Sequence, residues 1–252
     1  MKVDEQKWAY ALGKIKGILD NANVEYWLEL GTLLGAVRDH KFIHYDTDID
    51  IGMLCVDAPK VIARINEFEA KGFKVDVTDN RICLSCEDCN VELMIYRSRG
   101  DVYWDLHLKQ APKFRRFITY FSMIGERLPY KNHLQKRNKQ MLKEKIVLSV
   151  IPDFAARFVR SVCFKIYELF GAKYCAVVVP KHFYDNLDWM RLYGMVFSIP
   201  SNVEDYLALR YGKDWRTPDL NYVTYSKDKT IDRKFGVGER TNLTLLKCRG
   251  EK

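Results

Sequence analysis

The sequence contains no uninterrupted run of about 18 apolar residues, and its first residues, MKVDEQKW, include no apolar signal region. The first absence argues against a membrane-spanning helix, and the second argues against a secretory signal peptide. We therefore expect a cytoplasmic protein that is soluble or is bound peripherally at the inner face of the membrane.

Cysteine is sparse and odd in number, with 7 among 252 residues. A framework of disulfides needs an even number and an oxidising compartment, so the cysteines are expected to be reduced. Cys83, Cys86 and Cys89 have a spacing that could hold a metal ion. Strong zinc sites instead use two separated Cys-x2-Cys pairs, and the remaining cysteines lie far away in the sequence. Reduced thiols beside a hairpin turn are therefore favoured over a zinc site.

Acidic residues are outnumbered, since 33 aspartates and glutamates face 41 lysines and arginines, which gives a formal net charge of +8 and a pI near 9.0. This surplus favours an anionic partner, but it does not choose among a nucleotide, a lipid head group and a nucleic acid. Apolar residues make up 48% of the chain, a fraction typical of a globular protein.

The acids concentrate in one short segment, where Asp46, Asp48 and Asp50 lie close together. On a β-strand, Asp48 and Asp50 would share one face, and Ile49 and Ile51 would share the other. Two neighbouring carboxylates repel each other unless a cation lies between them. Magnesium commonly binds one or two carboxylates and takes its other ligands from water and substrate phosphates. The pattern predicts a strand with one buried face and one face that holds Mg²⁺ or Mn²⁺.

The preceding segment, LELGT at residues 28–32, predicts a strand that turns into a helix. Gly31 lets the backbone come close to a ligand, and the first free N–H groups of a helix point at an anion. A phosphate at this turn, with a metal ion on the next strand, suits phosphoryl transfer.

Two islands of the sequence resemble a known family. The segments WLELGTLLGAVR at 27–38, FI at 42–43 and DTDIDIG at 46–52 closely resemble the LicD/fukutin-related phosphotransferases, and SIPSNVEDYLALRYGKDW at 198–215 resembles them more weakly. Those proteins belong to the nucleotidyltransferase fold superfamily. The resemblance implies a metal-dependent transfer of a phosphocholine-type or other phospho-alcohol group. The donor would be CDP-linked and the acceptor a glycan hydroxyl, as in the decoration of lipopolysaccharide, capsule or teichoic acid.

The resemblance also implies roles for individual residues. The catalytic and metal-binding set comprises Asp48, Asp50 and Glu92. The substrate- and nucleotide-binding set comprises Gly31, Thr32, Arg38 and Asp46. Glu92, in the run Val91-Glu92-Leu93, would bind the metal ion or take the proton from the attacking hydroxyl. A solvent-facing glutamate remains the alternative for Glu92, and a cation that stabilises the helix dipole remains the alternative for Arg38.

Apolar periodicity predicts helices over residues 4–21, 33–38, 57–72, 154–170 and 201–211, and strands over 24–30, 48–54, 73–78, 81–85, 90–96 and 102–108. With the resemblance, these elements predict an α/β (α+β) fold, in which a nucleotidyltransferase-like mixed sheet with flanking helices forms a catalytic core over residues 1–125. Residues 126–252 are expected to be largely helical and to end in a tail.

A basic run at residues 131–145 contains six lysines and arginines and one acid, Glu144, and it precedes the amphipathic helix expected at 154–170. Such a pair of segments suits an anionic membrane or the acceptor glycan. The alternative is a solvated basic face beside a helix that covers the sheet.

Three functions remain open. The favoured one is the phosphotransferase, whose partners would be a CDP-linked donor and a glycan or lipid-linked glycan, with peripheral contact to an anionic membrane. A nucleotidyltransferase proper, acting on RNA or a small molecule, would use the same aspartates, although nucleic acid is not an expected partner. A non-catalytic polyanion-binding module would explain the charge but gives no reason for Asp48 and Asp50.

Overall fold

The computed structural model describes residues 3–87, 89–109, 123–133, 146–169, 173–220, 222, 227–235, 245 and 248. Helices in that part of the chain include α1 (Glu5–Asn21), α2 (Leu30–Asp39), α3 (Ala58–Ile62), α4 (Ile65–Ala70), α7 (Asp153–Leu169) and α8 (Val203–Tyr211), with the 3-10 turns η1 (Cys55–Asp57), η3 (Leu128–His133) and η4 (Lys181–Phe183). Residues 123–127 and 146–149 are also helical. The strands are β1 (Tyr26–Leu28), β2 (Ile49–Leu54), β3 (Lys74–Val77), β4 (Arg81–Ser85), β5 (Asn90–Arg99), β6 (Val102–Lys109), β7 (Lys173–Pro180), β8 (Asp188–Leu192), β9 (Met195–Ile199) and β10 (Ile231–Asp232).

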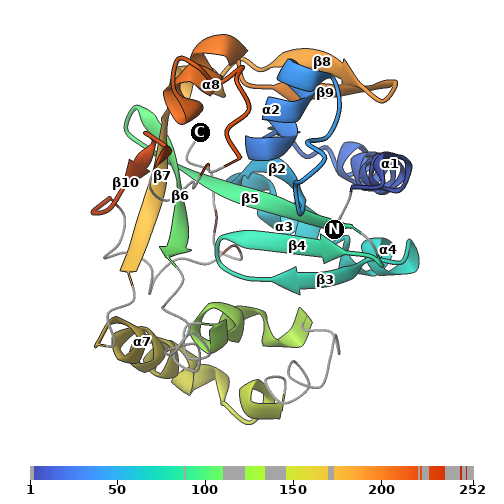
Figure 1. The fold of residues 1–252 in the computed structure, drawn as a ribbon. Coiled ribbons are helices and arrows are strands. Elements are labelled where there is room, and N and C mark those ends of the chain that lie inside the picture. The colour runs from blue at the N-terminus through green and yellow to red at the C-terminus, as the bar shows by residue number, and fades with distance from the viewer. Residues whose placement is uncertain are drawn as a thin grey trace.

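Within these residues, eight strands form one mixed sheet in the order β1-β2-β5-β6-β7-β10, with β4 also paired with β5 and β3 paired with β4. β2 pairs parallel with β5 and antiparallel with β1. The remaining two strands, β8 and β9, form a separate hairpin. Figure 1 shows α2, α8 and this hairpin at one end of the molecule and α7 at the opposite end. The predicted mixed sheet with flanking helices is confirmed.

Strand β2 turns one face to the hydrophobic core and carries the side chain of Asp50 on the other face. Ile49, Ile51 and Met53 are fully buried in the main core. Helix α1 supplies part of that core, and its N-terminus is capped by Asp4, whose side chain accepts a hydrogen bond from the Lys7 backbone N–H. The predicted alternation along β2 therefore holds, and it leaves the side chain of Asp50 on the face opposite the isoleucines.

The expectation that the C-terminal portion is largely helical needs correction. It contains α7 and α8, but it also contains β7, β8, β9 and β10. β7 pairs along its whole length with β6, so the sheet continues past the boundary predicted at residue 125. The run Val177-Val178-Val179 in β7 is rich in β-branched residues, but a short apolar run can form a strand or a helix, and periodicity does not distinguish them.

The expectation that all cysteines are reduced is wrong for one pair. Cys55, just after β2, forms a disulfide with Cys248, which lies 193 residues later. Sequence spacing could not reveal this pair, because the tertiary fold brings the two residues together. The backbone N–H of Cys86 donates to the carbonyl of Cys89 (2.9 Å), as expected for a hairpin turn. Among the described residues, Cys83, Cys86 and Cys89 do not form a metal-ligand cluster.

None of the helices in the described ranges has the length and apolar character that crossing a membrane requires.

Candidate active site

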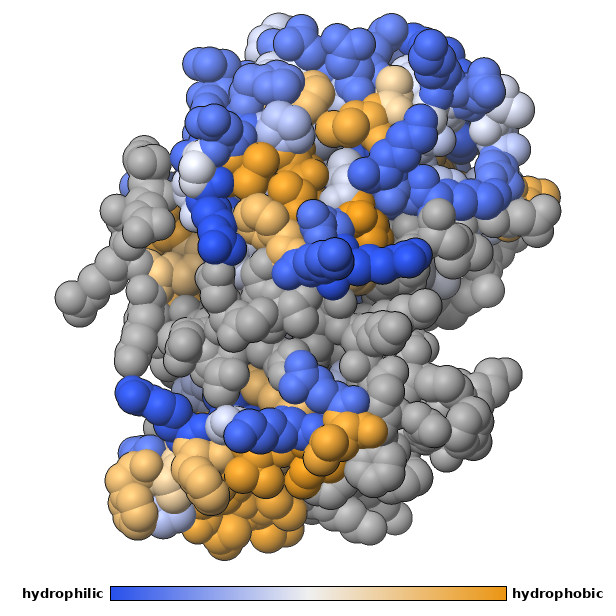
Figure 2. All heavy atoms as spheres, turned by 90° about the vertical axis from the view of Figure 1, so that its left-hand side faces the viewer, coloured by the Kyte–Doolittle hydropathy of each residue, from blue (hydrophilic) through white to orange (hydrophobic). Residues whose placement is uncertain are grey.

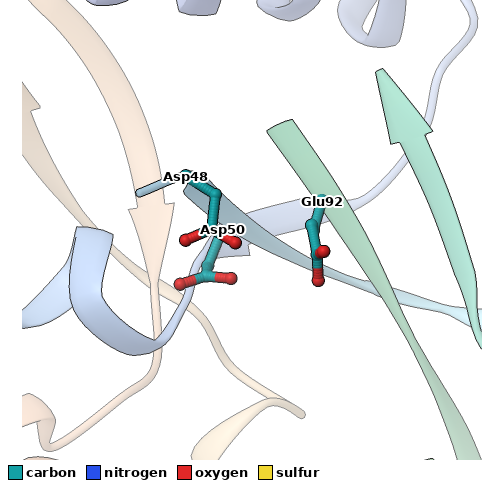
Figure 3. Close-up of side chains that lie close together, drawn as sticks. All are labelled: Asp48, Asp50 and Glu92. Carbon is teal, nitrogen blue, oxygen red and sulfur yellow. The ribbon is translucent and has the colours of Figure 1, made fainter. Parts of the chain in front are cut away.

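Three carboxylates from adjacent strands form the centre of the site. Asp50 on β2 is the register partner of Glu92 on the parallel strand β5, and Asp48 lies just before β2. Carboxylate oxygens of Asp48, Asp50 and Glu92 lie within 4.8 Å of one another. Figure 3 shows that the three side chains extend from the two strands in the same direction. The structure thus brings together the three acids that the sequence analysis selected.

The electrostatics of the cluster favour a bound cation. Burial, with a contribution from the neighbouring Asp48, raises the pKa of Asp50 well above its ordinary value. Burial, followed by the charge of Glu92, also raises the pKa of Asp48. Three converging carboxylates are an unfavourable arrangement unless positive charge compensates them. Oxygen ligands of this kind suit Mg²⁺ or Mn²⁺, so the residues present fit the predicted metal ion.

Arg81 supplies one fixed positive charge at the edge of this cluster. Its Nε lies 3.2 Å from Oε2 of Glu92, and its guanidinium also pairs with Oδ2 of the fully buried Asp105 at 3.5 Å. Arg81 thereby fixes the orientation of Glu92. Sequence analysis missed Arg81 and Asp105. The arginine at the start of the apolar strand RICLS could have been noticed in the sequence. Its pairing with Asp105 on β6 could not, because only the folded sheet brings the two side chains together.

Asp46 lies against the first turn of α2. A Cβ atom added at Gly31 would collide with Oδ2 of Asp46, so glycine is required for this close approach. Burial raises the pKa of Asp46 to about 6, although a hydrogen bond from the Thr47 backbone N–H opposes the shift. Leu30, the first residue of α2, has φ of 44°, a conformation that costs a non-glycine residue on the order of 1 kcal/mol. Leu30 is one of five non-glycine residues with positive φ in the described chain, and it lies where the predicted phosphate turn begins.

Thr32 has a different environment from the one expected. Its side chain is buried, and its hydroxyl oxygen accepts a hydrogen bond from the backbone N–H of Asp50 at 2.8 Å. Thr32 is not among the residues that line the adjacent cavity. We therefore assign its side chain to positioning Asp50, in place of the predicted contact with phosphate.

A buried polar network attaches α2 to the C-terminal half of the chain. Glu29 is fully buried, and its carboxylate accepts hydrogen bonds from Trp27 (2.6 Å), Tyr184 (3.0 Å) and Arg210 (2.6 Å). Arg210, fully buried on α8, also donates to Oδ2 of Asp228 through Nε (3.0 Å) and a second nitrogen (2.7 Å). Sequence analysis missed these residues, although a lone glutamate in the apolar run WLEL was a signal.

The carboxylates open into a cavity of about 740 Å³. Its lining combines the residues of the predicted site with residues of the C-terminal half, namely Leu30, Gly31, Leu34, Arg38, Ile43, Tyr45, Asp46, Asp48, Asp50, Arg81, Glu92, Tyr211, Asp214, Trp215, Thr217, Pro218, Asp219, Leu220, Tyr222 and Lys227. The guanidinium of Arg38 is held by Asp39 through bonds of 3.0 and 2.7 Å. The cavity thus has a carboxylate wall, a wall rich in aromatic residues, and cations at Arg38 and Lys227.

Replacement of Gly31 by alanine should lower catalytic turnover by about 10- to 100-fold, because the added methyl group displaces Asp46 within a site that needs exact geometry. Steady-state kinetics of the purified variant would measure this effect. Gly17→Ala, on an exposed position of α1 where a Cβ meets nothing within 4 Å, is the matched control and should leave turnover unchanged. Equal turnover of the two variants would show that Asp46 does not need this position.

Comparison with known proteins agrees with the geometry. Residues 23–164 match the family described as LicD/FKTN/FKRP, nucleotidyltransferase domain. An uncharacterized protein of Rickettsia prowazekii is 41% identical over 103 residues, which are 41% of this chain and 38% of that protein. Human ribitol 5-phosphate transferase FKRP is 46% identical over 43 residues, which are 17% of this chain and 9% of FKRP. The chain therefore spans less than half the length of the curated relatives it matches.

Among solved structures, the lincosamide antibiotic adenylyltransferase LnuA bound to lincomycin has a TM-score of 0.39 and 13% identity, over 82% of this chain and 84% of LnuA. The family match covers more than half of the chain and includes the whole predicted motif from Trp27 to Gly52. It confirms the family and the nucleotidyltransferase-like fold expected from the sequence. The chain belongs to the LicD/FKTN/FKRP family, through its nucleotidyltransferase domain.

Proposed function

We propose that this protein is a metal-dependent phosphotransferase, which moves a phospho-alcohol group from a CDP-linked donor to a hydroxyl of a glycan. The observation that carries the proposal is the convergence of Asp48, Asp50 and Glu92 at the opening of a cavity of about 740 Å³. Family membership supports the reaction class. The name of FKRP, a ribitol 5-phosphate transferase, supports a phospho-polyol among the phospho-alcohol groups expected from the sequence.

Asp48 and Asp50 would hold the metal ion, Mg²⁺ or Mn²⁺, which when bound neutralises charge on the donor phosphates, and Glu92 lies beside them as the proton acceptor. Gly31 lines the cavity at the start of α2, beside Asp46, and Arg38 offers charge-assisted hydrogen bonds to the leaving nucleotide. The rings of Tyr211 and Tyr222, with centroids 4.9 Å apart, border the cavity and offer a stacking surface to the cytosine base.

In the transfer itself, the acceptor hydroxyl oxygen forms a bond to the phosphorus of the transferred group. The bond from that phosphorus to the bridging oxygen breaks, and CMP leaves with the bonding electrons. Glu92, held in orientation by Arg81, takes the proton of the attacking hydroxyl. For an acceptor carried on a lipid, the enzyme would work at the cytoplasmic face of an anionic membrane, in peripheral contact with it.

The purified protein should release CMP from CDP-choline or CDP-ribitol when Mg²⁺ and a glycan acceptor are present, and EDTA should abolish the release. The chemical reason is that uncompensated donor phosphates and carboxylates repel each other in the cavity. Chromatographic measurement of CMP over time, with each donor separately, tests the reaction class and the transferred group together.

Parallel incubations with CTP and ATP test the alternatives. Pyrophosphate release in place of CMP release would show a nucleotidyltransferase proper. Nucleotide binding without any turnover, under every donor and metal condition, would indicate a polyanion-binding module and would contradict the proposal.

A further inference from the structure

Helix α7 is held against the sheet by one well-defined face. Phe164 and Tyr167 are buried with Trp104 of β6 in a small apolar cluster. Arg160, also buried, forms an ion pair with Asp79 and donates to a backbone carbonyl at residue 125 (3.1 Å). These contacts fix the rotation of the helix, so the direction of its other face is fixed too.

That other face is also apolar. Phe154, Phe158 and Leu169 are 89%, 73% and 83% exposed, and Val162 is exposed beside them. Because these positions follow helical spacing, they form one stripe, here called the α7 apolar face. The short helical segment at residues 146–149 and the turn that follows it expose three further apolar side chains, those of Ile146, Val147 and Val150. Figure 2 shows hydrophobic atoms gathered at the end of the molecule where α7 lies, with hydrophilic side chains directly beside them.

α7 thus has one apolar face buried against the sheet and a second apolar stripe that is exposed, and exposed apolar stripes of this kind mark an interaction surface. The charge of the stripe indicates the partner. Lys165 is exposed and, by its spacing from Phe158 and Val162, lies within the stripe, while the exposed Arg157 borders it. A lysine in this position can keep its ammonium group at lipid phosphates while the neighbouring side chains enter the acyl boundary. The exposed acids of α7 are Glu168, which by helical spacing lies nearer the stripe than Arg157 does, and Asp153, which pairs with Lys131.

A second copy of the chain fits the stripe less well. A symmetric dimer through one helix face would bring two copies of Lys165 into the same desolvated interface, where like charges repel. Stable interfaces also bury about 800 Å² per partner, which is more than a single stripe of four apolar side chains supplies. The net charge of +8 further favours an anionic surface over another copy.

We propose that the α7 apolar face is the surface by which this protein lies on an anionic membrane, with Phe154 and Phe158 inserted at the acyl boundary. The reason for such a contact, a lipid-linked acceptor, rests on the proposed function. The binding itself follows from the described residues of α7.

The test is sedimentation of the full chain at low salt with vesicles of phosphatidylcholine alone and of equal parts phosphatidylcholine and phosphatidylglycerol. We expect binding to the anionic vesicles, and weaker binding to the neutral ones. The double variant Phe154→Ser/Phe158→Ser should bind the anionic vesicles about 100-fold more weakly, since two large apolar side chains are removed from the boundary. Lys165→Gln should weaken binding about fivefold.

Trp189→Ser is the matched control, because Trp189 is an exposed aromatic residue on β8, at the opposite end of the molecule in Figure 1. It should bind vesicles as the unaltered protein does. Circular dichroism of each variant checks that it is folded. Failure of the unaltered protein to bind, or equal binding by the double variant, would overturn the proposal. A dimer in analytical ultracentrifugation that the double variant converts to monomer would instead identify a second copy as the occupant.

The membrane contact and the catalytic function can fail separately. Asp50→Asn should bind vesicles normally, and the double variant should still release CMP with a soluble acceptor. Failure of the unaltered protein to bind anionic vesicles while it releases CMP contradicts the membrane surface alone. Normal vesicle binding without any CMP release contradicts the proposed reaction alone.

Discussion

Replacement of Asp50 by asparagine should lower the rate of phospho-alcohol transfer by about 1,000-fold, because it removes a central charge from the metal-binding set and with it several kcal/mol of transition-state stabilisation. The same change should not reduce stability. Asp50 is buried, and its pKa is raised well above its ordinary value by burial and by neighbouring acids, so an uncharged amide relieves repulsion in the folded state. We expect an inactive variant whose melting temperature is equal to that of the unaltered protein or higher.

Two further variants complete this experiment. Asp48→Asn should show a loss of the same order, since Asp48 belongs to the same cluster. Asp101→Asn is the control, because Asp101 is exposed in the turn between β5 and β6 and should keep full activity. CMP release and thermal unfolding are measured on all three. Transfer at the normal rate by both cluster variants would remove the metal assignment.

Replacement of Arg210 by methionine should lower the free energy of unfolding by about 3–5 kcal/mol. Methionine retains much of the apolar volume, so the loss reports mainly on the charge. Without the guanidinium, the fully buried Glu29 and the buried Asp228 lose their cationic partner in an environment from which water is excluded. Chemical denaturation monitored by fluorescence measures the change.

The matched control is Arg216, which follows α8 and pairs with Glu204 on the surface. Both side chains of this ion pair are more than half exposed, so Arg216→Met should cost at most about 1 kcal/mol. If Arg210→Met is no more destabilising than Arg216→Met, then the buried network does not stabilise the fold and Glu29 is compensated in some other way.

The local part of the site could be predicted from the sequence. Alternation of aspartate and isoleucine depends only on the period of a strand, so the two faces of β2 were correctly separated. β4 was predicted with the bounds that it has, because RICLS is short, apolar and flanked by a turn. Glu92 was selected by resemblance, and its proximity to Asp50 follows from the parallel register of β2 and β5.

The parts that depend on contacts between distant segments could not be predicted. Arg81 reaches Asp105 across the sheet, and the side chain of Arg210 reaches Glu29 from a helix that begins 174 residues later in the chain, at Val203. Spacing and composition carry no information about such partners. The single helix predicted over residues 57–72 is interrupted between α3 and α4. The interruption could not be predicted because the spacing of apolar residues continues across it. Thr32 illustrates a further limit, since its residue type suited phosphate but its hydroxyl serves the backbone of Asp50.

The buried network around Glu29 has a consequence for the order in which the chain acquires its structure. Glu29 leaves the ribosome well before Arg210, which lies 181 residues later in the chain, and before Asp228, which follows Arg210. Until then the carboxylate that caps α2 has no cationic partner, and the aromatic wall of the cavity does not exist. Contacts of such long range are made late and slow the folding of a domain. The catalytic carboxylates and the wall facing them should therefore form one cooperative unit with the C-terminal half, and a fragment that ends at residue 125 should not fold into a working core by itself.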